Sequence, residues 1–214
     1  MSQQPDLTKT AEMLVDHYQK TYEVTYELWN ARNRLFPTLA AVIGGGAFLA
    51  FRVPGADSLF VAVIGGLVKL DAQTQTALQQ GITYQILQTV LLVVVFHLLL
   101  DLYRHTQDIT RNYLYMAGLE AEIRQALGFS AEKVAFTRED VFYKKHRVRL
   151  LGGVRYVYSI VLGLLLALFL YARISDDIHL GSPAFIIVDG IIALLIIIYF
   201  IAYLFPNLLT RKKS

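Results

Sequence analysis

Three ionisable residues, His97, Asp101 and His105, occur at intervals of four at the end of a strongly apolar run. Residues four apart share one face of an α-helix, so these side chains are predicted to form one polar line. An unpaired ionisable group in a bilayer costs several kcal/mol, so the line indicates pore lining, a proton relay or metal binding. The structural alternative is that His97 hydrogen-bonds a neighbouring helix and Asp101 pairs with Arg104 or His105. His97 and Asp101 are therefore candidate pore-lining residues.

Asp189 is a second isolated charge, six residues after Pro183 in an otherwise apolar run. In an oligomer it could form part of a ring around a pore. In a single chain it could accept a hydrogen bond from a tyrosine or serine on an adjacent helix. Pairing with His97 is not expected, because the two differ by about 10 Å in predicted depth. Both interpretations stay open, and Asp189 completes the candidate pore-lining set.

The densest basic cluster precedes a predicted membrane span and contains Lys144, Lys145, Arg147 and Arg149. Juxtamembrane basic residues attract anionic lipid, each by about 1 kcal/mol, and they help to fix the topology. The alternative is a site for a phosphate-bearing signal such as a nucleotide, since Arg and Lys bind phosphate oxygens. These residues are candidates for a lipid or phosphate ligand.

Several classes of chemistry are disfavoured. His97 and His105 are about 12 Å apart along a helix, too far for one metal ion without other ligands. The sequence has no cysteine, which excludes thiolate sites and disulfides. It contains no GxSxG, HExxH, Walker or GxGxxG pattern. We therefore expect neither an enzyme nor a metal or cofactor site, and a net charge of +3 does not indicate DNA or RNA binding.

The composition indicates several membrane spans, because 55% of the 214 residues are hydrophobic and only 17% are charged. One helix is predicted from Tyr84 to Gly128, apolar to Tyr103 and charged thereafter. Three further spans are predicted at 35–51, 154–172 and 183–205. The apolar run Leu59–Leu70 is too short to cross and is expected to be interfacial, re-entrant or a short packed helix.

The charged half of the long helix has a heptad pattern. Leu102, Ile109, Met116 and Ile123 recur every seven residues, with Tyr113, Glu120 and Leu127 as a second register. This pattern predicts a pairing seam. Its expected partner is an aromatic stripe on the helix Thr10–Arg34, formed by Val15, Tyr22, Trp29 and Phe36 with Tyr18 and Tyr26 beside them. Gly128 is predicted to end the long helix.

Small residues at intervals of four favour close helix packing within the membrane. They occur in the first span as Ala40 with Gly44, Ala41 with Gly45 and Gly46 with Ala50, and in the third span as Ser159, Gly163 and Ala167. These stripes predict helix–helix contacts and favour a homo-oligomer.

The distribution of basic residues predicts the orientation. Of the 20 Lys and Arg residues, four lie before the first span, ten from Arg104 to Arg155 and three in the tail, whereas Arg52, Lys69 and Arg173 fall in the other two connections. Basic loops stay in the cytosol. Both termini and the central region are therefore expected to be cytosolic. The first residues also lack the pattern of a cleaved secretory signal.

Residues 1–127 resemble the bacterial SLATT-type membrane effector domains. The resemblance rests on short motifs: Arg32, Asn33 and Arg34 before the first span, and His105, Tyr113, Leu119, Glu122 and Ile123 after the second. The chain differs from that family in its long connection between spans and in its second pair of spans. The resemblance implies a membrane effector that breaches the bilayer when a partner senses infection or a nucleotide signal.

The sequence thus predicts an all-α polytopic protein of the bacterial inner membrane, with four spans and a cytosolic helical stalk. The expected function is an oligomeric pore-forming or membrane-perturbing effector gated through its cytosolic helices; the resemblance implies a role in bacterial defence and a signal from a cytosolic sensor protein or a nucleotide. The alternative is a non-conducting anchor or scaffold that recruits a soluble partner. The predicted organisation is a cytosolic amphipathic helix (1–34), a first transmembrane pair with its outer connection (35–103), a stalk with a basic juxtamembrane helix (104–153), a second transmembrane pair (154–206) and a basic tail (207–214).

Overall fold

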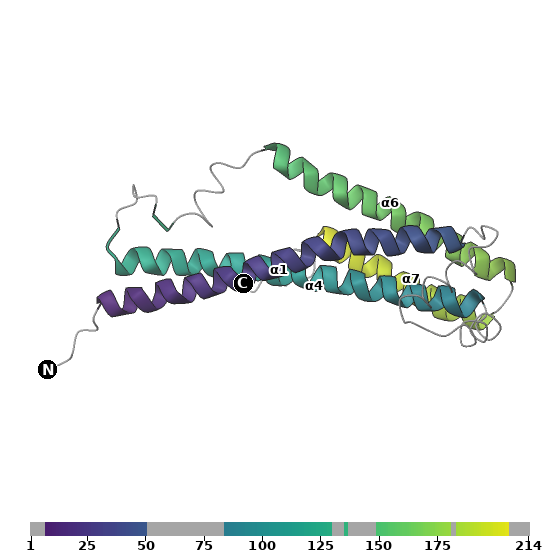
Figure 1. Cartoon of the computed structure of the whole chain (residues 1–214), viewed down its shortest axis with the longest axis horizontal. Helices are drawn as coiled ribbons and strands as arrows, with labels where there is room; N and C mark the ends of the chain where they lie inside the picture. The colour runs from purple at the N-terminus through teal and green to yellow at the C-terminus, as the bar shows by residue number, and fades with distance from the viewer. Residues whose placement is uncertain (1–6, 51–83, 130–134, 137–148, 181–182, 206–214) are drawn as a thin grey trace, which may run out of the picture. The chain divides into compact units, whose positions relative to one another are not determined.

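The computed structural model describes residues 7–50, 84–129, 135–136, 149–180 and 183–205, and all regular structure in this part of the chain is α-helical. The helices are α1 (Leu7–Ala50), α4 (Tyr84–Ala126), α6 (Arg149–Leu180) and α7 (Pro183–Leu204) (Figure 1). The all-α prediction is therefore confirmed. The run Leu59–Leu70 and the basic residues Lys144, Lys145 and Arg147 lie outside the described residues.

Three of these helices are long and apolar enough to cross a membrane: α4 from Ile86, α6 over Val157–His179, and α7. Most of the surface of these apolar segments is exposed, and the exposed side chains of α7 include Ile187, Ile191 and Ile198. Helices that are apolar all round are suited to lipid. This supports a multi-pass membrane protein. The described part of α1 after Arg34 is shorter, and a fourth span there stays a prediction.

The chain forms two compact units. Unit 1 contains residues 1–34 and 104–155, and unit 2 contains residues 35–103 and 156–214. Two of the divisions, after Arg34 and after Tyr103, fall where the sequence changes between charged and apolar. The helices α1 and α4 each contribute one part to unit 1 and one part to unit 2.

Unit 1 pairs the first part of α1 with the second part of α4. Ile109, Met116 and Ile123 of α4 are buried, as the first heptad register predicts. The second register is mixed, because Glu120 is buried while Tyr113 and Leu127 are partly exposed. A pairing seam along α4 is therefore confirmed for the first register only.

The facing side of α1 differs from the prediction. The fully buried residues of α1 in unit 1 are small, Ala11 and Thr25, and they lie two heptads apart. Tyr26 and Trp29 are 56% and 42% exposed, so the aromatic stripe does not form the centre of the seam. Small side chains allow two helix backbones to approach closely, and large aromatic rings then fit only at the edges.

Polar contacts cross this seam. The Tyr18 hydroxyl donates to Oε1 of the buried Glu120 at 3.1 Å, and His17 Nε2 lies 2.7 Å from the Tyr115 hydroxyl. On the exposed face of α1, Lys20 donates to Asp16 at 2.8 Å. That hydrogen bond and the charge of Asp16 raise the pKa of Lys20. Exposed pairs contribute little stability, so the seam rests mainly on its buried residues.

Gly128 ends α4, as predicted. Its φ of 61° is in the left-handed region that glycine adopts without strain. The Gly128 N–H donates to the Gln125 carbonyl at 3.2 Å and the Phe129 N–H to the Arg124 carbonyl at 3.0 Å. This pair of bonds is the Schellman motif, which satisfies the last carbonyls of a helix.

The core of unit 2 is formed by apolar residues from all four helices. They are Leu39 and Ile43 of α1, Leu92, Val95 and Leu99 of α4, Leu162, Leu166 and Phe169 of α6, and Ala193 and Ile196 of α7. Gly46 of α1 is buried against this core, because a Cβ placed there would overlap Leu91 and lie 2.9 Å from Phe169. The end of α1 therefore packs tightly against α4 and α6.

Two helices are longer than the predicted spans. The helix α1 continues through Pro37, so the N-terminal helix and the first apolar segment form one element. The predicted third span ends at Ala172, but α6 continues to Leu180. Arg173 and the acidic residues after it were expected to lie outside the membrane, whereas the structure buries Arg173 and Asp177 inside unit 2.

Candidate functional site

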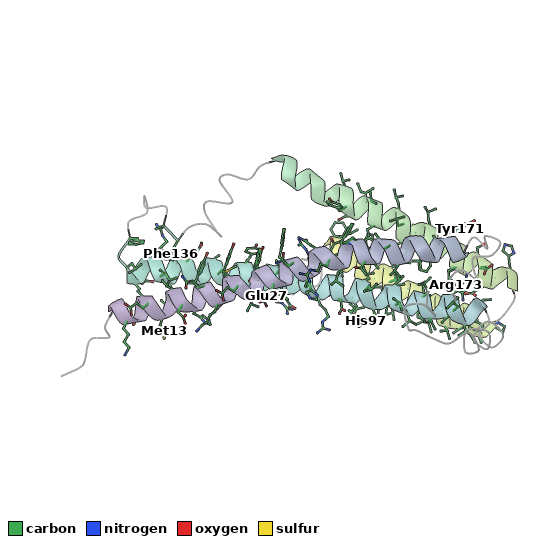
Figure 2. All side chains as sticks on the ribbon, in the orientation of Figure 1. Met13, Glu27, His97, Phe136, Tyr171 and Arg173 are labelled. Atoms are coloured by element: carbon green, nitrogen blue, oxygen red, sulfur yellow. The ribbon has the colours of Figure 1, made fainter. Side chains whose placement is uncertain are left out.

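Arg173 is the centre of a buried charged cluster in unit 2. It lies near the end of α6, two residues after the exposed Tyr171 (Figure 2), and its side chain is completely buried. Its Nη1 atom lies 2.6 Å from Oδ1 of Asp177, one turn further along α6. Its Nη2 atom pairs with Oδ2 of Asp189 on α7. One guanidinium therefore contacts two carboxylates from two helices.

The helix α4 supplies the uncharged members of the cluster. Arg173 Nη1 donates to Gln88 Oε1 at 2.7 Å, and Arg173 Nη2 donates to Thr89 Oγ1 at 3.2 Å. The Thr89 hydroxyl in turn donates to Asp189 Oδ2 at 3.1 Å. Charge-assisted bonds of this kind are stronger than neutral ones. Together they join α4, α6 and α7 through one arginine side chain.

The cluster lies at the same end of all three helices. Gln88 and Thr89 are near the beginning of α4, Asp189 is near the beginning of α7, and Arg173 is near the end of α6. Each of these four residues is separated, along its own helix, by about 21–24 Å from the far end of that helix's apolar segment. A hydrocarbon core is about 30 Å thick. The cluster is therefore placed within the apolar segments, towards one end.

The hydrogen bonding of the cluster is incomplete within the described part of the chain. Both carboxylate oxygens of Asp177, Oδ1 of Asp189, Nε2 of Gln88 and Nε of Arg173 are buried and form no hydrogen bond there. The short contact between Asp177 and Arg173 is thus an ion pair without hydrogen-bond geometry. Two carboxylates share one guanidinium, so the described cluster has more negative charge than Arg173 can balance when both aspartates are ionised.

A cluster of this composition has two physical consequences. First, it fixes how the three helices meet, because removing one partner leaves a buried charge uncompensated. Second, it is a place where a proton or a small polar ligand is stabilised. No group of three or more His, Cys, Asp or Glu side chains in the described residues is placed to hold a metal ion.

Asp189 is thus placed by the structure inside the single chain. It accepts a hydrogen bond from a threonine, Thr89, rather than from a tyrosine or serine, and it pairs with an arginine that the sequence analysis assigned to a connection. Its expected separation from His97 agrees with the structure, in which Asp189 contacts α4 at Thr89, near the beginning of that helix. A ring of Asp189 around a pore in an oligomer stays a prediction.

His97 and Asp101 lie on α4 away from this cluster (Figure 2 labels His97). His97 Nε2 is 3.5 Å from Asp101 Oδ2, and the two side chains are 70% and 28% exposed. The outward face that carries His97 also carries Val90 and Val94. His97 therefore forms a pair within its own helix and faces away from the core of unit 2.

The predicted packing residues have different environments. Ser159 is buried and Ala167 is exposed, while a Cβ on Gly163 would lie 3.1 Å from Phe200 of α7. Gly44 and Gly45 are exposed, and a methyl group added at either would have nothing in the described part of the chain within 4 Å. Of the three glycines of α1 in the predicted small-residue registers, Gly46 makes the tight contact. Arg149 begins α6.

Sequence reasoning missed Gln88, Thr89, Arg173 and Asp177. The predicted helix from Tyr84 includes Gln88 without assigning it a role, and the orientation count places Arg173 among the connection charges. One signal was present in the sequence. Arg173 and Asp177 are four residues apart, so on a helix their opposite charges lie side by side and form a pair without net charge. Thr89 gives no signal in the sequence, since threonine is common in transmembrane helices.

Comparisons with known proteins give no family. The sequence matches no family model, no curated protein and no solved structure. The function must therefore be argued from the chemistry of the chain itself.

Proposed function

We propose that the protein is an oligomeric multi-pass membrane effector that forms a pore or perturbs the bilayer. In this proposal α1 supplies a fourth span, and unit 1 and both termini are cytosolic. Arg173 is buried within unit 2 and therefore does not count as a charge in a connection between spans. Without it, the excess of basic residues on the proposed cytosolic side is larger, which supports this orientation further. The resemblance to SLATT-type domains suggests a bacterial inner membrane and a signal from a sensor protein or a nucleotide.

The observation that carries the proposal is the outward position of His97. Its side chain is 70% exposed in an apolar helix segment, about 9 Å along α4 from Tyr103. An ionisable group that faces lipid costs several kcal/mol. A second copy of the chain or a water-filled path would remove that cost. Either arrangement requires an oligomer with α4 at its interior face.

Membrane potential tests this proposal directly. The protein is expressed at increasing levels, and the potential is followed with a dye beside the variants His97→Leu and Val93→Leu. Val93 is 46% exposed on α4 and lacks an ionisable group, so it is the matched control. We expect the unaltered protein and Val93→Leu to depolarise the membrane and His97→Leu to do so less. Unchanged potential with all three proteins, including on co-expression with neighbouring genes, would reject a pore.

The absence of cysteine makes the topology directly testable. Single cysteines are introduced as Ser214→Cys and Ser182→Cys and labelled in intact cells with a membrane-impermeant maleimide. The proposed topology predicts labelling of the cysteine at position 182 only. After the membrane is permeabilised, both should react. The mass of the protein in detergent then tests the oligomer, since a strict monomer of four helices encloses no aqueous path.

A non-conducting anchor that recruits a soluble partner is the second candidate. It is favoured by the apolar side chains that unit 1 exposes, including Met13 at 65% and Leu114 at 72%. Exposed apolar groups of this size are typical of protein-binding surfaces when they are contiguous. Substituting Met13 and Leu114 by Ser would then abolish recruitment, whereas the pore proposal predicts that these changes leave depolarisation by the overexpressed protein unaltered.

A further inference from the structure

The charge of the buried cluster is unbalanced. Its described members carry one positive charge, on Arg173, and two negative charges when Asp177 and Asp189 are both ionised. All three side chains are completely buried. An uncompensated charge inside a protein or a bilayer is strongly unfavourable, and such groups usually become neutral instead. The cluster therefore needs one additional positive charge to be neutral.

The two carboxylates are not equivalent. Asp189 Oδ2 accepts a hydrogen bond from Thr89 and also pairs with Arg173. Asp177 pairs with Arg173 Nη1, and neither of its oxygens accepts a hydrogen bond within the described residues. Hydrogen bonds donated to a carboxylate stabilise its ionised form. Asp189 is therefore the better site for the negative charge and Asp177 the better site for neutralisation.

A proton fits this site better than a metal cation. A metal ion needs several oxygen ligands at once, and the adjacent guanidinium of Arg173 would repel it. A proton needs a single oxygen, and Oδ2 of Asp177 forms no hydrogen bond within the described residues. Gln88 Nε2 is an unsatisfied donor in the same cluster, which suits a bound water through which the proton could exchange.

We propose that the cluster is a proton-binding site in which Asp177 holds one exchangeable proton while Arg173 and Asp189 remain an ion pair. The proton is taken up from water and protonates a carboxylate, with no other bond formed or broken. With the proton bound, the cluster is neutral and α4, α6 and α7 remain joined. Loss of the proton leaves one buried negative charge and weakens the packing of these three helices. The inference goes beyond the proposed pore and does not depend on it.

Other titratable groups of unit 2 are placed as follows. On α6, Asp176 and His179 lie close to Asp177 in sequence, and Asp176 has a partner of its own. On α4, His97 and Asp101 form a separate pair. On α7 only Tyr199 and Tyr203 remain, and the segment of α1 within unit 2 has no titratable side chain. Four charged residues between α1 and α4, Arg52, Asp57, Lys69 and Asp71, lie outside the described residues.

Infrared spectroscopy of the full-length protein tests the proposal, because a protonated carboxyl group has a C=O stretch that a carboxylate lacks. The protein is reconstituted in phosphatidylcholine vesicles, and spectra are recorded at neutral and alkaline pH in H2O and D2O. We expect one protonated carboxyl per chain at neutral pH, with a band that shifts in D2O and is lost at alkaline pH. The variant Asp177→Asn should lack the band, and the control Asp101→Asn should retain it.

Three further variants keep the test decisive. Asp189→Asn retains the pair of Arg173 with Asp177 and also removes the excess acid, so its band should be lost even if Asp177→Asn does not fold. Absence of the band from the folded unaltered protein overturns the proposal, as does its persistence in folded Asp177→Asn or, if that variant does not fold, in Asp189→Asn. A band that appears only in Arg52→Gln or Lys69→Gln shows that a basic side chain neutralises the cluster, and this outcome also overturns it.

Discussion

Arg173 on α6 and Asp189 on α7 form an ion pair in which both side chains are completely buried. The pair connects the last part of α6 to the first part of α7, and Thr89 connects α4 to the same two side chains. A buried pair is not in itself evidence of high stability, because both charges lose their hydration. Its main physical effect is to make one arrangement of the three helices much more favourable than others.

The first prediction concerns removal of the arginine. Arg173→Leu leaves Asp177 and Asp189 buried without a cation and should destabilise the protein by about 3–5 kcal/mol. The control is Arg111→Gln, because the Arg111 side chain is 73% exposed and only 3.7 Å from Asp108 in a surface pair. That change should cost less than about 1 kcal/mol. Unfolding by denaturant in detergent micelles measures both.

The same experiment separates charge from packing. If Arg173→Leu is combined with Asp177→Leu and Asp189→Leu, no buried charge remains, and most of the lost stability should return. A triple variant that is no more stable than Arg173→Leu alone would mean that the polar contacts, and not the uncompensated charge, determine the stability of this region.

The second prediction concerns pH. At neutral pH the folded protein should hold one more proton than the unfolded chain, in which aspartates are ionised. The free energy of unfolding should then fall as pH rises, by up to about 1.4 kcal/mol per pH unit for one proton. In Asp177→Asn this slope should disappear near neutral pH. A slope of the opposite sign in the unaltered protein would contradict the proton-binding site.

The third prediction concerns close packing in α1. Gly46→Ala places a methyl group against Leu91 and Phe169 and should destabilise unit 2 by about 1–3 kcal/mol. Gly45→Ala places the methyl group where no described residue lies within 4 Å. That change should be neutral, or stabilising by up to about 1 kcal/mol through helix propensity. Thermal unfolding of the two variants in one detergent compares them directly.

If Gly45→Ala is the more harmful variant, the exposed face of α1 is in contact with another molecule. The oligomeric state of that variant would then show whether the contact is with a second copy of the chain.

The fourth prediction concerns the seam of unit 1. Met116→Ala removes a completely buried side chain and should cost about 2–5 kcal/mol. Leu114→Ala, two residues away on α4, removes a side chain that is 72% exposed and should change stability by less than about 0.5 kcal/mol. Hydrogen exchange of the amides of α1 and α4 measures the stability of this unit locally. Equal effects of the two changes would argue against the seam.

Much of the fold follows from the sequence alone. Long apolar runs need hydrogen bonds within the segment in a bilayer, and this requirement makes helices of α4, α6 and α7. The seven-residue spacing of Ile109, Met116 and Ile123 predicts a buried face because that spacing returns to the same side of a helix. Gly128 predicts the end of α4 because glycine adopts a positive φ without strain.

The tertiary structure alone determines which charges meet. In the sequence alone, Arg173 and Asp177 are charged residues that indicate the end of a span. The sequence does not show that Asp189 and Thr89 lie against them from other helices. In the same way, Gly44, Gly45 and Gly46 are alike in sequence, and only the positions of Leu91 and Phe169 show that Gly46 is the one at the contact. Periodicity determines the face of one helix, whereas the partner of a buried polar group depends on how several helices are arranged in space.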